Sequence, residues 1–259
     1  MNDVLKTIDK RVSLRKYKDT QITDEHKERI IKSAMRAPTA GNMMLYSIIT
    51  VEDDKKKEKL SKSCDNQPFI KNAPLILIFL ADMQRWYDYY KSCDVEKYCK
   101  DNDLEFRGPE VSDLLLASND AIIAAQNAVI AAESLDIGSC YIGDIMENYE
   151  IHKEMFNLPD LVFPISMLCL GYYPEDSKRI IKPRFNKKYI VYNEEYKRLT
   201  NDEFKDMFSH LEKVIPDKNK FNAKNPGQFI YARKTGAEFS KEMVRSVNKA
   251  LEKWDGKKL

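Results

Sequence analysis

The segment Ala121-Ile-Ile-Ala-Ala-Gln-Asn-Ala-Val-Ile-Ala-Ala132 lies inside a helix that we predict to run from Val111 to Leu135. Alanine recurs along this helix, so several of its sides are too small and apolar to face water alone. Small side chains let neighbouring backbones approach closely, which predicts a central or interface helix. The apolar run is shorter than the roughly 18 to 20 residues of a membrane span, so we expect no membrane insertion.

Apolar strands are predicted on both sides of this helix. Leu75-Ile-Leu-Ile-Phe-Leu80 is continuously apolar, which indicates a strand buried on both faces. Other strands are predicted at residues 46–51, 138–142 and 163–170, and intervening helices at 4–10, 24–35, 53–61 and 147–156. Because helices and strands alternate through residue 171, we predict an α+β fold with a mixed central β-sheet flanked by helices.

Composition excludes one large class of functions. The chain has 259 residues, with 43 Lys and Arg against 41 Asp and Glu, and a formal net charge of +2. Proteins that bind the nucleic-acid backbone usually carry a strongly basic domain, so we expect no nucleic-acid partner. The charged tail contains two further predicted helices, at 202–214 and 239–254, and we predict a core domain at 1–190 with a C-terminal extension at 191–259.

The cysteine pattern favours reduced thiols. Five cysteines form no C-x-x-C pair, and the three histidines stand at no ligand spacing, so we expect no metal site. The N-terminus lacks the basic region and apolar core of a secretory signal. We therefore expect a cytoplasmic protein.

Two basic clusters share the period of an extended chain. Within Arg11-Val-Ser-Leu-Arg15, alternation places Arg11, Ser13 and Arg15 on one face, a set of donors that suits a phosphate. Lys182-Pro-Arg184 repeats the period far along the chain and could clamp the same anion from its other side. Each cluster could equally be an ordinary solvated basic segment.

A third segment, Ala37-Pro-Thr-Ala-Gly-Asn42, follows a predicted helix. Pro38 ends the helix, and Gly41 permits a backbone geometry that is closed to other residues. Thr39 and Asn42 are then short donors and acceptors that could bind a planar heterocycle. Simple helix termination before a strand explains the same residues.

These motifs occur in a recognisable order together with Gln67-Pro-Phe, Gly138-Ser-Cys-Tyr-Ile-Gly143 and Leu170-Gly-Tyr. The chain resembles the FMN-dependent nitroreductase family over roughly residues 4 to 190. The resemblance implies a nitroreductase-like FMN-binding fold and an intertwined homodimer with two FMN sites at the subunit interface.

The resemblance also implies which residues bind FMN. The implied contacts are Arg11, Ser13, Lys182 and Arg184 with the phosphate; Arg15 with the phosphate or the pyrimidine edge; Gln67 with the pyrimidine edge; the backbone of Tyr141, Ile142 and Gly143 near flavin N5 and O4; and, from the partner subunit, Pro38, Thr39 and Asn42.

The implied reaction is a ping-pong cycle. NADH or NADPH delivers hydride to flavin N5 and leaves, and a small-molecule acceptor such as a nitroaromatic or quinone takes its place. The chemistry belongs to the cofactor, so no catalytic side chain is predicted. The alternatives are another FMN enzyme of the same fold, such as a reductive dehalogenase or a dehydrogenase, and a non-catalytic flavin-binding protein.

Three segments depart from this pattern or extend it. Met43-Met-Leu-Tyr46 replaces the Gln-Pro-Trp type sequence of many family members. The tail resembles that of a clostridial-type subgroup, and we expect it to wrap onto the other subunit. Residues 82–109 form an aromatic excursion, whose rings around Trp86 either wall the flavin or pack on the core.

Overall fold

The computed structural model describes residues 1–212, 215 and 219–257, which form two compact units. The core unit contains Met1–Arg179 and the C-terminal segment from Glu242, and the second unit contains Ile180–Lys241. This division falls at other residues than the predicted boundary between 190 and 191. Docking of the extension on a partner subunit stays a prediction.

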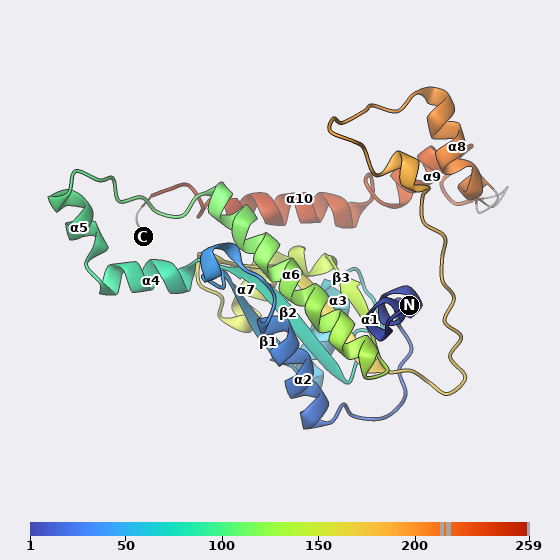
Figure 1. Cartoon of the computed structure of the whole chain (residues 1–259), viewed down its shortest axis with the longest axis horizontal. Helices are drawn as coiled ribbons and strands as arrows, with labels where there is room; N and C mark the ends of the chain where they lie inside the picture. The colour runs from blue at the N-terminus through green and yellow to red at the C-terminus, as the bar shows by residue number, and fades with distance from the viewer. Residues whose placement is uncertain (213–214, 216–218, 258–259) are drawn as a thin grey trace. The chain divides into compact units, whose positions relative to one another are not determined.

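The described residues of the core unit form a four-stranded sheet in the order β1-β2-β4-β3 (Figure 1). Each neighbouring pair of strands is antiparallel. Among the described residues the sheet is therefore antiparallel and not mixed as expected, since the parallel pairing of Ser13 with Ser139 is an isolated bridge outside the strands. The strands are β1 (Tyr46–Val51), β2 (Leu75–Asp82), β3 (Ile137–Ile142) and β4 (Val162–Tyr172).

The predicted helices are present with small shifts at their ends, and the aromatic excursion contains two further helices, α4 and α5. Residues Lys213 and Val214 of the predicted helix 202–214 lie outside the described residues. The helices of the core unit are α1 (Asp3–Lys10), α2 (Asp24–Met35), α3 (Asp54–Ser63), α4 (Gln84–Ser92), α5 (Val95–Asp101), α6 (Val111–Ser134) and α7 (Tyr149–Phe156), with 3₁₀ turns η1 (Ala40–Asn42) and η2 (Asp144–Met146). The remaining elements are η3 (Lys187–Tyr189), α8 (Asn201–Glu212), α9 (Pro226–Arg233) and α10 (Glu238–Leu251).

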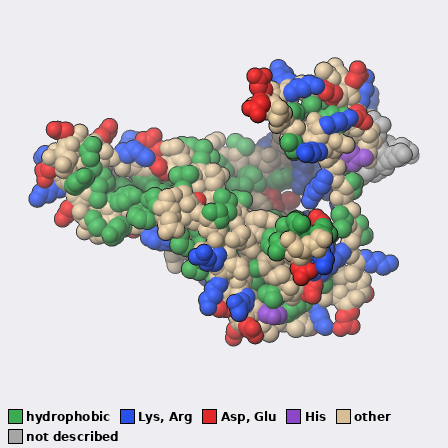
Figure 2. Space-filling view, viewed as in Figure 1, with side chains coloured by type: hydrophobic (Ala, Val, Ile, Leu, Met, Phe, Trp, Pro, Cys, Tyr) green, Lys and Arg blue, Asp and Glu red, His purple; other side chains and the backbone are tan. Residues whose placement is uncertain are grey.

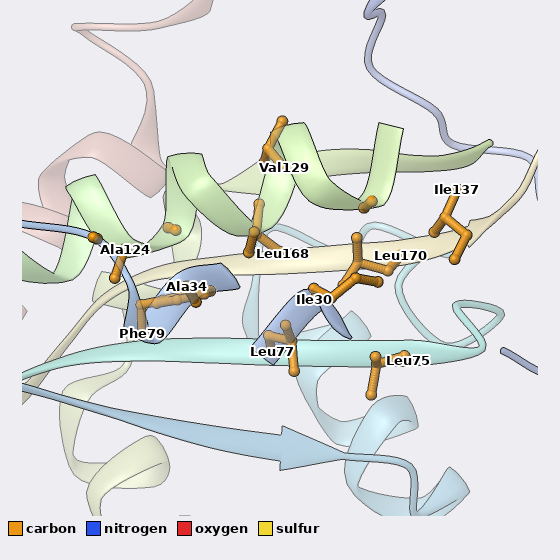
Figure 3. Packing of buried hydrophobic residues seen from close by; sticks show 14 of the residues in the cluster. Ile30, Ala34, Leu75, Leu77, Phe79, Ala124, Val129, Ile137, Leu168 and Leu170 are labelled. Carbon is orange, nitrogen blue, oxygen red and sulfur yellow. The ribbon is translucent and has the colours of Figure 1, made fainter. Parts of the chain in front are cut away.

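Strand β2 is buried along its whole length, as its continuous apolar run predicts. Leu75, Leu77 and Phe79 lie in one apolar cluster with α2 and α6, and Figure 3 shows these side chains between the sheet and the two helices. Ile76 and Ile78 point to the opposite face and join a second cluster, which includes residues of α3. Each such side chain contributes about 1.5 to 3 kcal/mol on full burial, so β2 holds both layers to the sheet.

Helix α6 is the central helix that its alanines predict. Alanines 117, 121, 124, 125, 128 and 132 are fully buried, which lets α6 pack closely on the sheet. Among the described residues, α6 is the one helix that is long and apolar enough to cross a membrane, by length and composition alone. Its inner side also buries Asp120 and Glu133, and carboxyl groups of this kind are rare within membrane spans.

The aromatic excursion packs on the core unit through two of its rings. Trp86 Nε1 donates a hydrogen bond of 2.8 Å to the Met43 carbonyl oxygen. Tyr87 is buried in an apolar cluster with Leu45 and Leu114. These contacts agree with the second interpretation of the excursion, in which the rings pack on the core.

Candidate functional site

The segment Arg11–Arg15 lies along β3. The Leu14 amide donates to the Ser139 carbonyl oxygen at 2.9 Å, and the Leu14 side chain is buried. Gly138 makes this close approach possible, because a Cβ at that position would lie 2.5 Å from the Leu14 side chain. Ser13 and Arg15 are exposed, as the predicted alternation requires.

Arg11 carries a buried donor that is unsatisfied. Its Nη1 atom has no hydrogen-bond partner among the described residues and almost no access to solvent. Burial raises the pKa of the Cys140 thiol, and the positive charges of Arg15 and Arg11 oppose that rise. A buried guanidinium nitrogen without an acceptor, beside a second cation, fits the phosphate of FMN, since phosphate oxygens accept such donors.

Gln67 is held in one orientation at the same edge of the sheet. Its Nε2 donates to the Cys64 carbonyl oxygen at 3.0 Å and to Asp144 Oδ2 at 2.6 Å. A carbonyl and an ionised carboxylate only accept, so the NH₂ group faces them and Oε1 remains to accept a ligand N–H. Arg15 Cζ lies 5.7 Å from the ring centre of Phe69, which links the basic segment to the Gln67 loop.

The end of β3 supplies the third predicted group. The Tyr141 hydroxyl donates to Gln126 Oε1 at 3.3 Å, and Ile142 is buried. Gly143 is exposed, and a Cβ there would meet no atom within 4 Å. The structure therefore brings residues 11–15, Gln67 and 141–143 to one edge, which we call the β3 edge.

The predicted loop at 38–42 is built at a different place. Gly41, Asn42 and Met44 all have left-handed backbone conformations, with φ of +55°, +57° and +51°. Thr39 Oγ1 accepts a hydrogen bond from the Met44 amide at 3.1 Å, and Pro38 and Asn42 are exposed. The chain continues through Leu45 directly into β1, and we call residues 38–45 the β1-edge loop.

The two parts of the predicted site lie at opposite corners of the sheet. Strands β2 and β4 separate β1 from β3, and three strand spacings amount to about 14 Å. Along the strands, Ser139 pairs with Leu170 and through it with Leu75, whereas Tyr46 pairs with Ala81. Six residues of β2 add about 20 Å. One chain therefore does not bring Thr39 and Asn42 to Arg11.

Lys182 and Arg184 are exposed and belong to the second unit. Their predicted contact with the phosphate that Arg11 binds stays a prediction.

Two buried carboxyl groups of the site region were not predicted from the sequence. Asp120 is 2% exposed and accepts hydrogen bonds from the Ala40 and Leu45 amides. Glu147 is 3% exposed, and burial followed by the nearby Asp144 raises its pKa to about 8. A charged residue within the alanine-rich face of α6 was the available signal for Asp120.

The cysteines are free thiols, as expected, and only Cys93 among them is exposed. Cys140 is 1% exposed, which fits a small buried apolar residue better than a reactive thiol. Within residues 1–212, 215 and 219–257, no group of His, Cys, Asp and Glu could hold a metal ion.

Comparison with known proteins identifies the family. Residues 8–172 match the model of the nitroreductase family. The chain belongs to the nitroreductase family. The expected resemblance and the nitroreductase-like α+β fold are thereby confirmed. Every predicted site residue except Lys182 and Arg184 lies inside the matched range.

Relatives in this family cover most of the chain. A protein of Bacillus subtilis (strain 168) named FMN reductase [NAD(P)H] is 33% identical over 212 residues, which cover 82% of this chain and 80% of that protein. FMN reductase (NADPH) of the same organism is 33% identical over 224 residues, with 84% and 83% covered. The structure of NfrA2 from B. megaterium superposes with a TM-score of 0.79 at 32% identity and covers 99% of both chains.

Proposed function

We propose that this protein is an FMN-dependent oxidoreductase that uses NADH or NADPH. When bound, FMN takes two electrons from the nicotinamide and passes them to a second small molecule, such as a nitroaromatic or a quinone, in a ping-pong cycle. The observation that carries the proposal is the buried, unpaired Nη1 of Arg11 at the β3 edge. The names of the two B. subtilis relatives support the same donor and cofactor.

The β3 edge supplies the contacts along the cofactor. Arg11, Ser13 and Arg15 bind the phosphate end, and Lys182 and Arg184 add positive charge to it. Gln67 offers Oε1 to an N–H of the pyrimidine edge, because Asp144 already engages its amide group. The open space beside Gly143 leaves room for a flat ring next to the end of β3.

The other wall of the site comes from a second copy of the chain. Thr39 and Asn42 lie at the opposite corner of the sheet, so they complete a site only in a homodimer. The outer face of α6 is suited to that contact, since large apolar side chains are exposed on it. These residues are Leu115, Leu116, Ile122 and Ile123, which are 62%, 44%, 42% and 40% exposed.

Helix α1 continues this apolar surface. Val4, Leu5 and Ile8 are 59%, 48% and 48% exposed. Figure 2 shows hydrophobic side chains over α1 and over the N-terminal end of α6. A second copy of the chain that covers both helices would remove these side chains from water, so we expect a homodimer. We also expect the protein to be located in the cytoplasm.

Purified protein tests the proposal directly. We expect a yellow preparation with about one FMN per chain, and NAD(P)H oxidation that menadione or a nitrofuran accelerates. Turnover no faster than that of free flavin would leave a non-catalytic flavin-binding protein. Activity confined to a halogenated or saturated substrate would favour the dehalogenase or dehydrogenase alternative.

One variant tests the residue that carries the proposal. Arg11→Ala removes a charge-assisted contact of about 1.5 to 3 kcal/mol, so FMN affinity should fall roughly 10- to 150-fold. The control is Arg29→Ala, which removes the same group from an exposed position of α2. Equal FMN affinity in the two variants would refute the phosphate contact.

A further inference from the structure

Asp120 is a buried carboxylate whose hydrogen bonds go to the backbone of a single loop. Oδ1 accepts from the Ala40 amide at 3.0 Å, and Oδ2 accepts from the Leu45 amide at 3.1 Å. No ion pair of Asp120 is found in the described part of the chain. Burying a charge is costly unless strong hydrogen bonds compensate, so these two bonds are needed to keep Asp120 inside.

The two bonds of Asp120 close the β1-edge loop at both of its ends. Between Ala40 and Leu45, the chain passes through left-handed conformations at Gly41, Asn42 and Met44. Residues with a Cβ adopt this conformation at an energetic cost, and the surrounding structure must hold them there. Since both oxygens of one rigid carboxylate bind this loop, Asp120 of α6 fixes the distance between the Ala40 and Leu45 amides.

Thr39 Oγ1, which lies within the loop, accepts from the Met44 amide at 3.1 Å. Two contacts from outside the loop hold its middle. The Met43 carbonyl accepts from Trp86, and the Met44 carbonyl accepts from Arg85 Nη1 at 3.3 Å. Neither contact reaches the backbone of Thr39 or Ala40. Asp120 is therefore the side chain from outside the loop that binds its backbone at both Ala40 and Leu45.

We propose that Asp120 is a positioning residue, which holds the β1-edge loop in the shape that lets Thr39 and Asn42 complete the FMN site of the partner subunit. The inference rests on the proposed function. It adds that a buried carboxylate of α6 sets the geometry of the neighbouring subunit's site. Because α6 presents its outer face to the second copy, the same helix carries the subunit contact and the loop support.

The direct test is Asp120→Asn, which keeps the shape of the side chain. One oxygen can still accept one amide, but the new NH₂ group faces the other amide, donor against donor. We expect FMN affinity, measured by quenching of flavin fluorescence, to fall about 5- to 20-fold while the dimer remains. The matched control is Asp101→Asn, the same change at an exposed position of α5.

A second variant leaves the buried carboxylate in place. Ala40→Pro removes the amide hydrogen that Asp120 Oδ1 accepts. Ala40 is the first residue of a 3₁₀ turn and follows an extended Thr39, two conditions that proline tolerates. This variant should lower FMN affinity in the same direction, even if Asp120→Asn does not fold.

Hybrid dimers separate positioning across the interface from local damage. In the proposed dimer, each site takes Arg11 from one subunit and the β1-edge loop from the other. When an Arg11→Ala subunit is combined with an Asp120→Asn subunit, one site therefore contains both substitutions and the other contains neither. We expect about half of the wild-type number of high-affinity FMN sites. A hybrid without any site of wild-type affinity would show that Asp120 acts within its own subunit and would overturn the inference.

The remaining outcomes distinguish this inference from the proposed function. A wild-type protein that binds no FMN overturns the proposed function, and this inference with it. If the wild type binds FMN and folded Asp120→Asn and Ala40→Pro dimers bind it equally well, the inference alone is overturned.

Discussion

The β3 edge and the β1-edge loop differ in how their polar groups are satisfied. At the β3 edge and beside it, Arg11 Nη1 and Glu147 Oε1 are buried and have no hydrogen-bond partner among the described residues. In the β1-edge loop, Asp120 and Thr39 bind the loop's own backbone. The β3 edge thus keeps polar atoms that can bind a ligand, whereas the polar groups of the β1-edge loop hold the loop in one conformation. A site made from both needs two chains.

The largest effect should follow from separating the two regions. Ile123→Glu places a charge on the exposed apolar face of α6, where burial against a second copy would leave it unpaired. The protein should become monomeric, and FMN affinity should fall by more than about 1,000-fold because one wall of the site is lost. Analytical ultracentrifugation and flavin fluorescence measure both changes.

The control for this experiment is Ile151→Glu on α7, where a similarly exposed isoleucine is 51% accessible. It should remain dimeric and bind FMN normally. A monomeric Ile123→Glu protein that keeps wild-type FMN affinity would show that the β3 edge suffices alone.

The second prediction uses Glu147, the buried acid beside the β3 edge. The pKa of Glu147 is raised to about 8 from its ordinary value of 4.5. Between these values the folded state keeps a proton that the unfolded state has lost, so its contribution to stability is present below pH 4.5 and disappears as the pH rises to 8. The loss from pH 5 to pH 8 is at most about 4 kcal/mol.

Glu147→Gln should therefore remove this loss, and the variant should gain stability over the wild type as the pH rises. Urea unfolding at pH 5, 6.5 and 8 measures the difference in unfolding free energy between the variant and the wild type. Burial lowers the pKa of His152, which gives the opposite slope in acid, but His152 is common to both proteins and cancels in their difference. If the unfolding free energies of the wild type and Glu147→Gln changed with pH in parallel, the prediction would be contradicted. The control is Glu154→Gln, the same substitution at an exposed position.

A third prediction concerns the predicted phosphate clamp from the second unit. Arg184→Ala should weaken FMN binding by about 1.5 to 3 kcal/mol, with a smaller dependence of affinity on salt, if Arg184 binds the phosphate. Arg198→Ala, another exposed arginine of the second unit, is the control. Identical titrations for the two variants would remove Arg184 from the phosphate site.

The sequence predicts the layers of this fold better than it predicts the site. The alanines of α6 and the apolar run of β2 depend on local periodicity, and both are found as predicted. The alternation of Arg11, Ser13 and Arg15 is also local. By contrast, the opposite placement of Thr39 follows from strand order, which no local pattern encodes. Asp120 and Glu147 gain their properties from burial by distant segments. The one local sign is the position of Asp120 among the alanines of α6, and it does not show which backbone groups Asp120 binds.

The smallest effect should come from Asp144, which orients Gln67 without binding the cofactor itself. Asp144→Asn can still accept from Gln67 Nε2 through its amide oxygen, but it loses the charge that strengthens the bond of 2.6 Å. FMN affinity should fall by about 0.5 to 1.5 kcal/mol.

The pKa of Glu147 should fall as well, because Asp144 is one of the charges that raise it. A variant that weakens FMN binding but leaves the pH dependence of stability unchanged would show that Gln67 and Glu147 respond to Asp144 separately. Both changes together would make the β3 edge one coupled unit, in contrast to the β1-edge loop, whose geometry Asp120 fixes through the backbone alone.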